Sequence, residues 1–286
     1  MKVAIYGSRR QQNYIDVIDR MLHTFACRGV EIVMASKLYR YLCDTTDIDL
    51  SGIGMIEGFR FSADIAISIG GDGTFLRTAR WVGDKEIPIV GVNTGHLGYL
   101  AAFSIADMDE MIEEIIAGNY SIERRSLLKI ETHDGNIGAY PYALNEVALI
   151  KTDTASMISS QVSVNGAEPA NYQADGLIIS TPTGSTGYNL SVGGPIIEPT
   201  APVFVISPIA AHALTMRPLV VADSSVIAVT TTCRAASFLI SLDGRSVSFE
   251  PGAKVTLRRA PFDTLVIQRR GHAFTDTLRN KLRWGL

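Results

Sequence analysis

Residues 63–82 read ADIAISIGGDGTFLRTARWV, and this stretch predicts the fold of the first part of the chain. Ala63–Ile69 is short and rich in isoleucine, which is typical of a buried strand. Three glycines and a threonine then surround Asp72, and Phe75–Val82 has helical periodicity. A strand, a glycine-rich loop and a helix in this order predict a βα unit of a parallel sheet.

The same alternation of strand and helix continues on both sides of this stretch. Upstream, Val3–Tyr6 and Val30–Met34 predict strands, and Tyr14–Ala26 predicts a helix between them. Downstream, Ile87–Val92 predicts another strand and Ile105–Ala117 another helix. We therefore expect an α/β domain at the N-terminus.

From about Leu127 the pattern changes to period-two strands joined by turn dipeptides. Asp134-Gly135, Asn165-Gly166 and Asp243-Gly244 are all typical of hairpin turns. Helical patterns nearly vanish, so we expect a second, mostly β domain. The expected strands are Leu128–His133, Tyr142–Ile150, Gln161–Val164, Leu177–Ser180, Val203–Ser207, Val226–Thr231, Phe238–Leu242, Val255–Arg258 and Thr264–Gln268.

The tail of the chain returns to helical periodicity over Phe274–Trp284, with apolar residues spaced by four. We expect this tail to pack back on the first domain. The expected division is therefore residues 1–122 and 270–286 in an α/β domain, and residues 123–269 in a mostly β domain.

Composition narrows the class of protein. The 286 residues suit one large domain or two modest ones, and 47% hydrophobic with 19% charged residues argues against fibrous or disordered chains. Lys and Arg number 26 against 29 Asp and Glu, a net charge of -3, so we expect neither nucleic acid nor membranes as partners. The cysteines are odd in number and lack C-x-x-C spacing, and the N-terminal apolar run is too short for a signal peptide, which favours a cytoplasmic protein.

The glycine-rich loop is the first candidate functional site. Without a Cβ at Gly71 and Gly73, backbone N–H groups can approach a phosphate closely. A carboxylate at Asp72 would repel that phosphate unless it takes a proton or faces a metal, which points to phosphoryl transfer. A tight βα turn with a helix-capping residue explains the glycines equally well.

The second candidate site follows the apolar strand Leu177–Ser180, where residues 180–188 read STPTGSTGY. Hydroxyl groups and free amides can bind phosphate or ribose oxygens, and Tyr188 offers a ring on which a purine can stack. An elaborate helix cap is the alternative. Because caps rarely need so many hydroxyl groups in succession, we favour ligand binding.

Other polar residues are less informative alone. Asn145-Glu146 is a polar pair inside an expected apolar strand, and a solvated edge strand explains it as well as a site does. Asp175 should lie at the opposite end of its strand from the hydroxyl-rich segment. Asp243-Gly244-Arg245 reads first as a hairpin turn and second as a ligand contact. Residues that could each touch an anion are Arg77, His96 and His212.

With the Gly70–Thr74 loop, the Asn145-Glu146 pair and the Thr181–Tyr188 segment in this order, the sequence resembles the NAD kinase family over nearly its whole length. Gly-Gly-Asp-Gly alone is shared with phosphofructokinases and with diacylglycerol and sphingosine kinases. The segments that make the resemblance specific, because they look like the NAD-binding part of those enzymes, are Asp175-Gly176-Leu177, Ser180–Thr186 and Ser191–Pro195.

This resemblance implies transfer of the γ-phosphoryl group of ATP, or of inorganic polyphosphate, to the 2′-hydroxyl of the adenosine ribose of NAD, which produces NADP. It implies a requirement for magnesium or another divalent cation, with unassigned ligands, and a homodimer or homotetramer. The implied fold is an α/β domain followed by a β-sandwich-like domain, with the C-terminal tail returning to the first.

The resemblance also implies roles for individual residues. Asp72 would lie near the acceptor hydroxyl, and Gly71 and Gly73 would lie against the phosphates. Residues implied to line the dinucleotide site or to neighbour it are Asn145, Glu146, Asp175, Thr186, Gly187, Tyr188, Asn189, Leu190, Ser191, Arg77 and Arg245. Gly187 stands where many members have alanine, and Gln173-Ala174 stands where several have a basic residue, so NADH use and donor choice stay open.

Two other functions remain as alternatives. A lipid kinase would share the glycine loop, but its usual continuation is Val-Asn-Glu-Val, whereas Phe75-Leu76-Arg77-Thr78 follows here, and no basic amphipathic helix suggests membrane docking. A non-catalytic dinucleotide sensor is the second alternative. Asp72 argues against it, because a mere phosphate binder would do better with a neutral or basic residue.

Overall fold

The computed structural model describes residues 1–7, 14–95, 98–132 and 137–285, so the expected Asp134-Gly135 turn and His96 lie outside the described residues. The chain forms two compact units. Unit 1 comprises Met1–Arg124 and Thr264–Leu286, and unit 2 comprises Arg125–Asp263. Two long strands, β7 (Tyr120–Thr132) and β18 (Lys254–Arg269), each have residues in both units.

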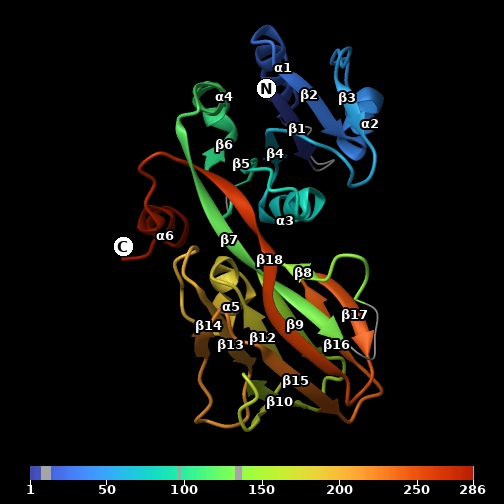
Figure 1. The fold of residues 1–286 in the computed structure, drawn as a ribbon, viewed down its shortest axis with the longest axis vertical. Helices are drawn as coiled ribbons and strands as arrows, with labels where there is room; N and C mark the ends of the chain where they lie inside the picture. Colours follow the sequence, from blue (N-terminus) through green and yellow to red (C-terminus); the bar gives the residue numbers. More distant parts are fainter. Residues whose placement is uncertain (8–13, 96–97, 133–136, 286) are drawn as a thin grey trace. The chain divides into compact units, whose positions relative to one another are not determined.

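Unit 1 is built on a parallel sheet with the strand order β3-β2-β1-β4-β5, and β18 pairs beside β5 (Figure 1). All carboxyl ends of these parallel strands therefore lie at one edge, and the strand order reverses between β1 and β4, where ligands usually bind in such sheets. The elements are β1 (Lys2–Gly7), α1 (Ile15–Cys27), β2 (Glu31–Ala35), α2 (Ser36–Thr45), β3 (Gly54–Ile56), β4 (Ile65–Ile69), α3 (Asp72–Val82), β5 (Ile89–Asn93), β6 (Phe103–Ser104), η2 (Ile105–Asp107), α4 (Met108–Ala117) and α6 (Phe274–Leu282).

The two faces of this sheet have separate cores. On one face, Val3 and Ile5 of β1 pack in a cluster with apolar residues of α1 and α4, among them Phe25 and Met111. The other face of β1 carries Ala4, which belongs to a second cluster that includes Trp81 of α3. Strands buried on both faces explain the continuous apolar runs in the sequence, and the expected α/β domain is confirmed.

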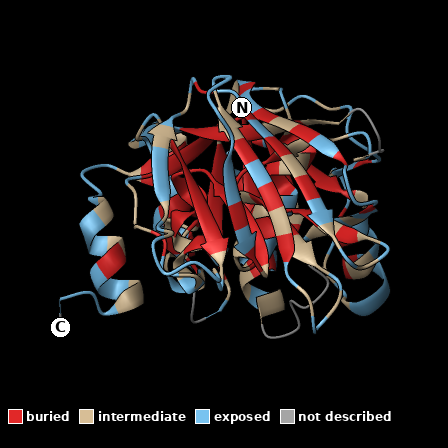
Figure 2. Ribbon diagram, turned by 90° about the horizontal axis from the view of Figure 1, so that it is seen from below, coloured by how far each residue is buried: buried red, intermediate tan, exposed pale blue. Residues whose placement is uncertain are grey.

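The C-terminal helix α6 groups with unit 1. It ends at Leu282, two residues before the expected end at Trp284, which is half exposed. Of its apolar residues spaced by four, Leu278 is buried, whereas Phe274 and Leu282 are partly buried, and Figure 2 shows the rest of the helix as mostly exposed.

Unit 2 has two layers of antiparallel strands (Figure 1). One sheet has the order β14-β13-β12-β9-β16-β17, and the other contains β11-β10-β15-β18. Buried side chains from both layers, such as Leu149 and Phe204 from the first and Val162 and Val229 from the second, form one apolar core. The elements between β7 and β18 are β8 (Tyr142–Ala143), β9 (Glu146–Lys151), β10 (Ile158–Val164), β11 (Ala170–Ala174), β12 (Gly176–Ser180), η3 (Thr183–Thr186), α5 (Tyr188–Ser191), β13 (Val203–Ile209), β14 (Leu219–Ala222), β15 (Ile227–Cys233), β16 (Phe238–Leu242) and β17 (Arg245–Phe249).

The mostly β second domain is thus confirmed, although β11, β14 and β17 match none of the expected strands and several expected strands have other bounds. The expected strand Tyr142–Ile150 is interrupted, because β8 ends at Ala143 and β9 begins at Glu146. The expected strands Val255–Arg258 and Thr264–Gln268 are parts of one continuous strand, β18.

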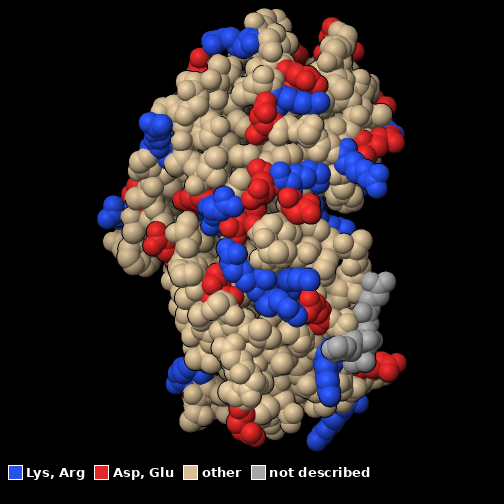
Figure 3. All heavy atoms as spheres, viewed as in Figure 1, with Lys and Arg blue, Asp and Glu red and all other residues tan. Residues whose placement is uncertain are grey.

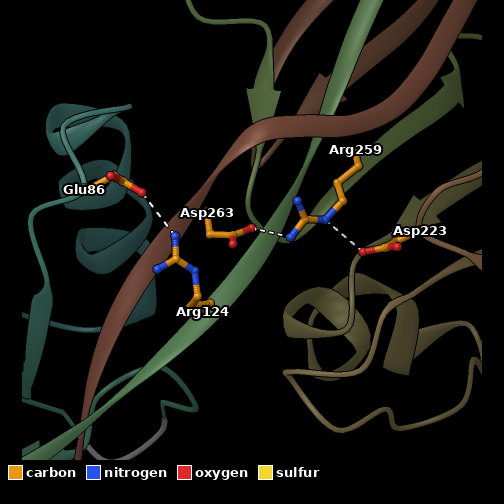
Figure 4. A network of polar contacts seen from close by, with 5 residues as sticks. All are labelled: Glu86, Arg124, Asp223, Arg259 and Asp263. Carbon is orange, nitrogen blue, oxygen red and sulfur yellow. Dashed lines mark hydrogen bonds and ion pairs between the residues drawn. The ribbon is translucent and has the colours of Figure 1, made fainter.

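Ion pairs hold the segments around β18 and β7 in place (Figure 4). In unit 2, the Arg259 guanidinium binds Asp223 (Nε–Oδ2 2.9 Å) and Asp263 (2.6 Å), and both carboxylates are largely shielded from solvent. In unit 1, Arg124 pairs with Glu86 at 3.1 Å, and both side chains are exposed. The shielded pairs contribute more to stability than the exposed one, because solvent screens exposed charges.

Candidate active site

The glycine-rich loop joins β4 to α3, as the sequence predicts. Gly70 has a φ of 148°, and a Cβ there would lie 2.5 Å from Thr74 Oγ1, so only glycine fits. The Gly71 carbonyl accepts hydrogen bonds from the N–H groups of Thr74 (2.8 Å) and Phe75 (3.1 Å), which starts the helix at Asp72, three residues earlier than expected. Asp72 therefore occupies the first position of α3, beside the amides that a phosphate would approach.

The Asp72 carboxylate has a fixed orientation. Its two oxygens accept hydrogen bonds from the backbone N–H groups of Tyr99 (2.8 Å) and Leu100 (3.2 Å). Gly98 lies so close that a Cβ on it would be 2.8 Å from Asp72 Oδ1. Burial raises the pKa of Asp72 above its ordinary value, although both N–H groups and the positive charge of Lys281 oppose that rise.

A cavity of about 360 Å³ opens in unit 1 at the carboxyl ends of β1, β2 and β3. Its lining includes the cations Lys37, Arg77 and Arg80 and the aromatic ring of Phe59. Arg77 also donates a hydrogen bond to Thr74 of the glycine-rich loop (3.0 Å), which links the cavity to the loop. Clustered cations beside aromatic walls suit a ligand that combines phosphates with a flat ring.

In unit 2, most hydroxyl groups of the 180–188 segment serve the fold itself. Thr181 Oγ1 donates to the Leu144 carbonyl (2.5 Å) and accepts the Gly184 N–H (3.1 Å). Ser185 Oγ exchanges hydrogen bonds with the backbone of Ile197. The hydroxyl groups of Thr181 and Ser185 therefore hold the backbone of this segment in place.

Asn189 has a similar internal role. It is fully buried, its amide donates to the carbonyls of Ser185 (3.3 Å) and Pro195 (3.2 Å), and its oxygen accepts from Ser207 Oγ (2.6 Å). A Cβ at Gly194 would lie 2.0 Å from this oxygen. In residues 180–191, the side chains or backbone that are at least partly exposed belong to Thr186, Gly187, Tyr188, Leu190 and Ser191.

The structure brings Asn145, Glu146, Gly187 and Tyr188 together. Among the described residues, buried Oδ1 of Asn145 and buried Oε2 of Glu146 have no hydrogen-bond partner. A Cβ at Gly187 would lie 3.1 Å from Glu146 Oε2 and 3.4 Å from Asn145 Nδ2. A buried polar atom without a hydrogen-bond partner lowers the stability of the fold, so these two oxygens are candidate acceptors for hydrogen bonds from a ligand.

Glu146 has an unusual proton affinity for a glutamate. Its pKa is raised to about 7, mainly by burial and also by repulsion from Asp243, while a hydrogen bond from the Tyr188 N–H opposes the rise. The folded chain therefore binds more protons than the unfolded chain between pH 4.5, the ordinary pKa of glutamate here, and about pH 7.

Stability should fall as pH rises through that window, since folding keeps a proton that the unfolded chain releases. Glu146→Gln removes this cost, so we expect the variant to be more stable than the native chain at pH 8 by roughly 3 kcal/mol. The gain should shrink towards zero near pH 4.5. Urea unfolding at both pH values measures it, and an equal difference at both would contradict the account.

Three other sequence-predicted residues contact different partners. Asp175 lies at the opposite end of β12 from Thr181, as expected, and pairs with Lys151 at 2.6 Å. The Arg245 guanidinium donates to the carbonyls of Tyr140 (2.9 Å) and Tyr142 (2.6 Å). His212 is exposed, and its backbone N–H donates a hydrogen bond to the Gln173 carbonyl.

Three features of the two sites have no local signal in the sequence. They are the Tyr99 and Leu100 amides that hold Asp72, the charge of Lys281 near Asp72, and the Asp243 carboxylate beneath Asn145 and Glu146. Each depends on residues more than 25 positions apart, so no local pattern could have indicated them.

Across the described ranges, no three His, Cys, Asp or Glu side chains gather closely enough to form a metal cage. The residues do fit a cation that arrives with a phosphate ligand, because Asp72 supplies one carboxylate at the loop and magnesium commonly binds one or two carboxylates together with substrate phosphates.

Comparison with known proteins identifies the family. The models described as the ATP-NAD kinase N-terminal and C-terminal domains match residues 10–120 and 144–269. A relative named NAD kinase from Bacteroides fragilis is 43% identical over 285 residues, which cover 100% of this chain and 98% of the relative. Another with that name, from Porphyromonas gingivalis, is 40% identical over 284 residues, which cover 99% and 98%.

Solved structures agree with the fold. Yeast NADH kinase complexed with NADH matches with a TM-score of 0.89 at 19% identity, over 100% of this chain and 88% of that one. An NAD kinase from Archaeoglobus fulgidus in complex with ATP matches with a TM-score of 0.73 at 24% identity, over 99% and 97%. On the strength of the two family models and the full-length relatives, the chain belongs to the NAD kinase family.

Proposed function

We propose that this chain transfers the γ-phosphoryl group of ATP to the 2′-hydroxyl of the adenosine ribose of NAD and so produces NADP. Relatives named NAD kinase that align over the full chain support this activity. The structural observation that carries the proposal is the Asp72 carboxylate, held by two backbone N–H groups at the start of α3 and beside a glycine-rich loop.

Asp72 would orient the acceptor hydroxyl and take its proton late in the reaction. A carboxylate is a weak base towards a ribose hydroxyl, so early proton removal is ruled out by the large difference in pKa. The raised pKa of Asp72 makes it a better acceptor for a proton released late. In a loose phosphoryl-transfer transition state, the nucleophile needs orientation more than activation. A divalent cation such as magnesium, bound with the donor, would neutralise charge on the phosphates.

On the donor side, we assign the triphosphate to the Gly71 and Gly73 amides and to the cations of the 360 Å³ cavity, with Phe59 beside the base. Cations and N–H groups bind phosphate oxygens through charge-assisted hydrogen bonds.

On the acceptor side, NAD would contact residues of unit 2 that are at least partly exposed or that carry a buried polar atom without a hydrogen-bond partner. Residues bonded within the protein would hold these contact residues in place. We assign contacts to Asn145, Glu146, Thr186, Gly187, Tyr188, Leu190 and Ser191, a supporting role to Asn189 and Arg245, and a peripheral position to Asp175.

Arg77→Met should raise KM for ATP by about tenfold, because one charge-assisted contact to a phosphate is worth about 1.5 kcal/mol or more. KM for NAD should change little. The matched control is Arg40→Met, which removes an exposed arginine of α2 paired with Glu57 outside the cavity. If both variants changed KM for ATP equally, the cavity would not be the donor site.

We also propose a cytoplasmic homodimer or homotetramer with NAD and ATP as its small-molecule partners. The three cysteines are free, which suits a reducing compartment. None of the described helices has the length and apolar character needed to cross a membrane. Acidic and basic side chains are interspersed on the face shown in Figure 3, so that face offers no broad basic surface for nucleic acid. Light scattering on the purified chain measures the oligomeric state.

The activity is tested by incubating the purified chain with NAD, magnesium and either ATP or polyphosphate, and by detecting NADP with an NADP-specific dehydrogenase. We expect NADP with ATP. Parallel reactions with diacylglycerol and sphingosine test the lipid-kinase alternative. NAD binding without phosphorylation of any acceptor would favour the sensor instead.

A further inference from the structure

Asp243 binds the backbone of residues 144–146 through hydrogen bonds. It occupies the turn between β16 and β17 with a φ of 46°. Its Oδ2 accepts the Leu144 N–H (2.8 Å), and its Oδ1 accepts the N–H groups of Asn145 (2.8 Å) and Glu146 (3.2 Å). Its own N–H donates to the Glu146 carbonyl (3.2 Å). These four hydrogen bonds explain why the strand is interrupted between β8 and β9.

The carbonyl groups of the same segment are held from the other side. Thr181 donates its N–H to the Asn145 carbonyl (2.9 Å) and its hydroxyl to the Leu144 carbonyl (2.5 Å). With both its amides and its carbonyls bound, the segment cannot shift. The backbone from which the side chains of Asn145 and Glu146 extend is therefore fixed, and each side chain has one buried oxygen without a hydrogen-bond partner among the described residues.

Asp243 also acts on the charge of Glu146. Among the described residues, the groups that shift the pKa of Glu146 besides its burial are the Asp243 carboxylate from the β16–β17 turn and the Tyr188 N–H from α5. Burial raises the pKa of Asp243 above its ordinary value, and three backbone N–H groups and the positive charge of Arg245 oppose that rise. Two carboxylates close together resist double ionisation. The Asp243 carboxylate accepts three backbone N–H groups and Glu146 only that of Tyr188, so we assign the shared proton to Glu146.

We propose that Asp243 is a positioning residue of the NAD site, which fixes Asn145 and Glu146 towards the adenosine ribose and makes NAD binding depend on the ionisation of Glu146. The inference rests on the proposed function. An ionised carboxylate can accept hydrogen bonds from both vicinal hydroxyls of a ribose, whereas a protonated one has one acceptor oxygen fewer. NAD should thus bind more tightly as Glu146 loses its proton.

The test is the pH dependence of KM for NAD and of kcat, measured at saturating ATP from pH 5.5 to 8.5. In the native chain, KM at pH 6 should be about tenfold higher than at pH 8, as follows from a titration near pH 7. In Asp243→Asn the repulsion is gone, so the rise should shrink to about threefold or less. At every pH, KM for NAD should be higher in Asp243→Asn than in the native chain. The new amide nitrogen cannot accept a hydrogen bond from a backbone N–H, which loosens the 144–146 segment.

A purely structural role for Asp243 would raise KM without changing its pH dependence, and that result would overturn the inference. The matched control is Asn165→Asp, which exchanges the same two side chains in reverse at the β10–β11 turn. Asn165 also has a positive φ (54°) and accepts a backbone N–H, that of Val226 (2.9 Å). We expect this control to keep the native pH dependence.

Glu146→Gln provides a second test that does not disturb Asp243, and it decides the question if Asp243→Asn does not fold. It should abolish the rise in KM at low pH, and a rise equal to that of the native chain would overturn the inference. NADP formation by the native chain at pH 8 tests the proposed function separately. If no NADP forms, calorimetric titration with NAD over the same pH range tests the inference on binding alone.

Discussion

Asp72→Asn is expected to lower kcat by a factor of about 10² to 10⁴, the usual contribution of a positioned acid–base group. KM for NAD should stay within about threefold of the native value, because Asp72 is assigned to the acceptor hydroxyl and not to binding of the dinucleotide. The amide keeps one oxygen for the Tyr99 or Leu100 N–H, and it removes a buried charge, so the fold should persist.

The control for this variant is Asp107→Asn. Asp107 is also an aspartate of unit 1 whose carboxylate accepts a backbone N–H, that of Ser104 (2.9 Å), but it lies at the start of α4. Its replacement should leave kcat unchanged. Thermal unfolding of both variants separates loss of chemistry from loss of structure. An Asp72→Asn enzyme with native kcat would refute the role given to Asp72.

Gly184→Ala should have the largest effect on stability. A Cβ at this buried position would lie 2.1 Å from the Asn145 carbonyl oxygen and 2.5 Å from its carbonyl carbon. Backbone atoms cannot move aside, and this backbone is already held by Thr181 and Asp243. We expect a loss of about 3 kcal/mol or more in the free energy of unfolding, together with weakened NAD binding.

Gly187→Ala is the comparison for that variant, because it adds the same methyl group in the same segment. There the nearest atoms are Glu146 Oε2 at 3.1 Å, the end of a flexible side chain, and the Gly184 carbonyl oxygen at 3.2 Å, so a shift of a few tenths of an ångström makes room. We expect a change of less than about 1 kcal/mol. Denaturant unfolding measures both variants. Equal stability of Gly184→Ala and the native chain would show that the segment is not packed as described.

The sequence predicted the α/β unit well because its signals are local. The run of isoleucines in β4, the glycines after it and the helical periodicity of α3 all lie within 20 residues. Helix α2 was not predicted because its buried face consists of little more than Leu38 and Leu42. Strands β14 and β17 were missed as well, since both lie at sheet edges and keep many exposed positions.

Features set by distant residues could not be read from the sequence. The interruption before β9 depends on Asp243, almost 100 positions away, and the hydroxyl-rich segment did not reveal that Thr181 and Ser185 bond internally. Arg258–Asp263 is charged and contains Pro261, so it suggested a gap between two strands, yet β18 continues through it. The sequence therefore indicated the motif residues, but not the contacts that fix their side chains.

The most direct test of the account is a reaction of the purified chain with ATP labelled in its γ-phosphoryl group, NAD and magnesium, followed by separation of the products. We predict that the label appears in the 2′-phosphate of NADP with the native chain, and that this transfer falls by at least about a hundredfold with Asp72→Asn. Label found only in free phosphate with the native chain, or equal labelling of NADP by both proteins, would contradict the account.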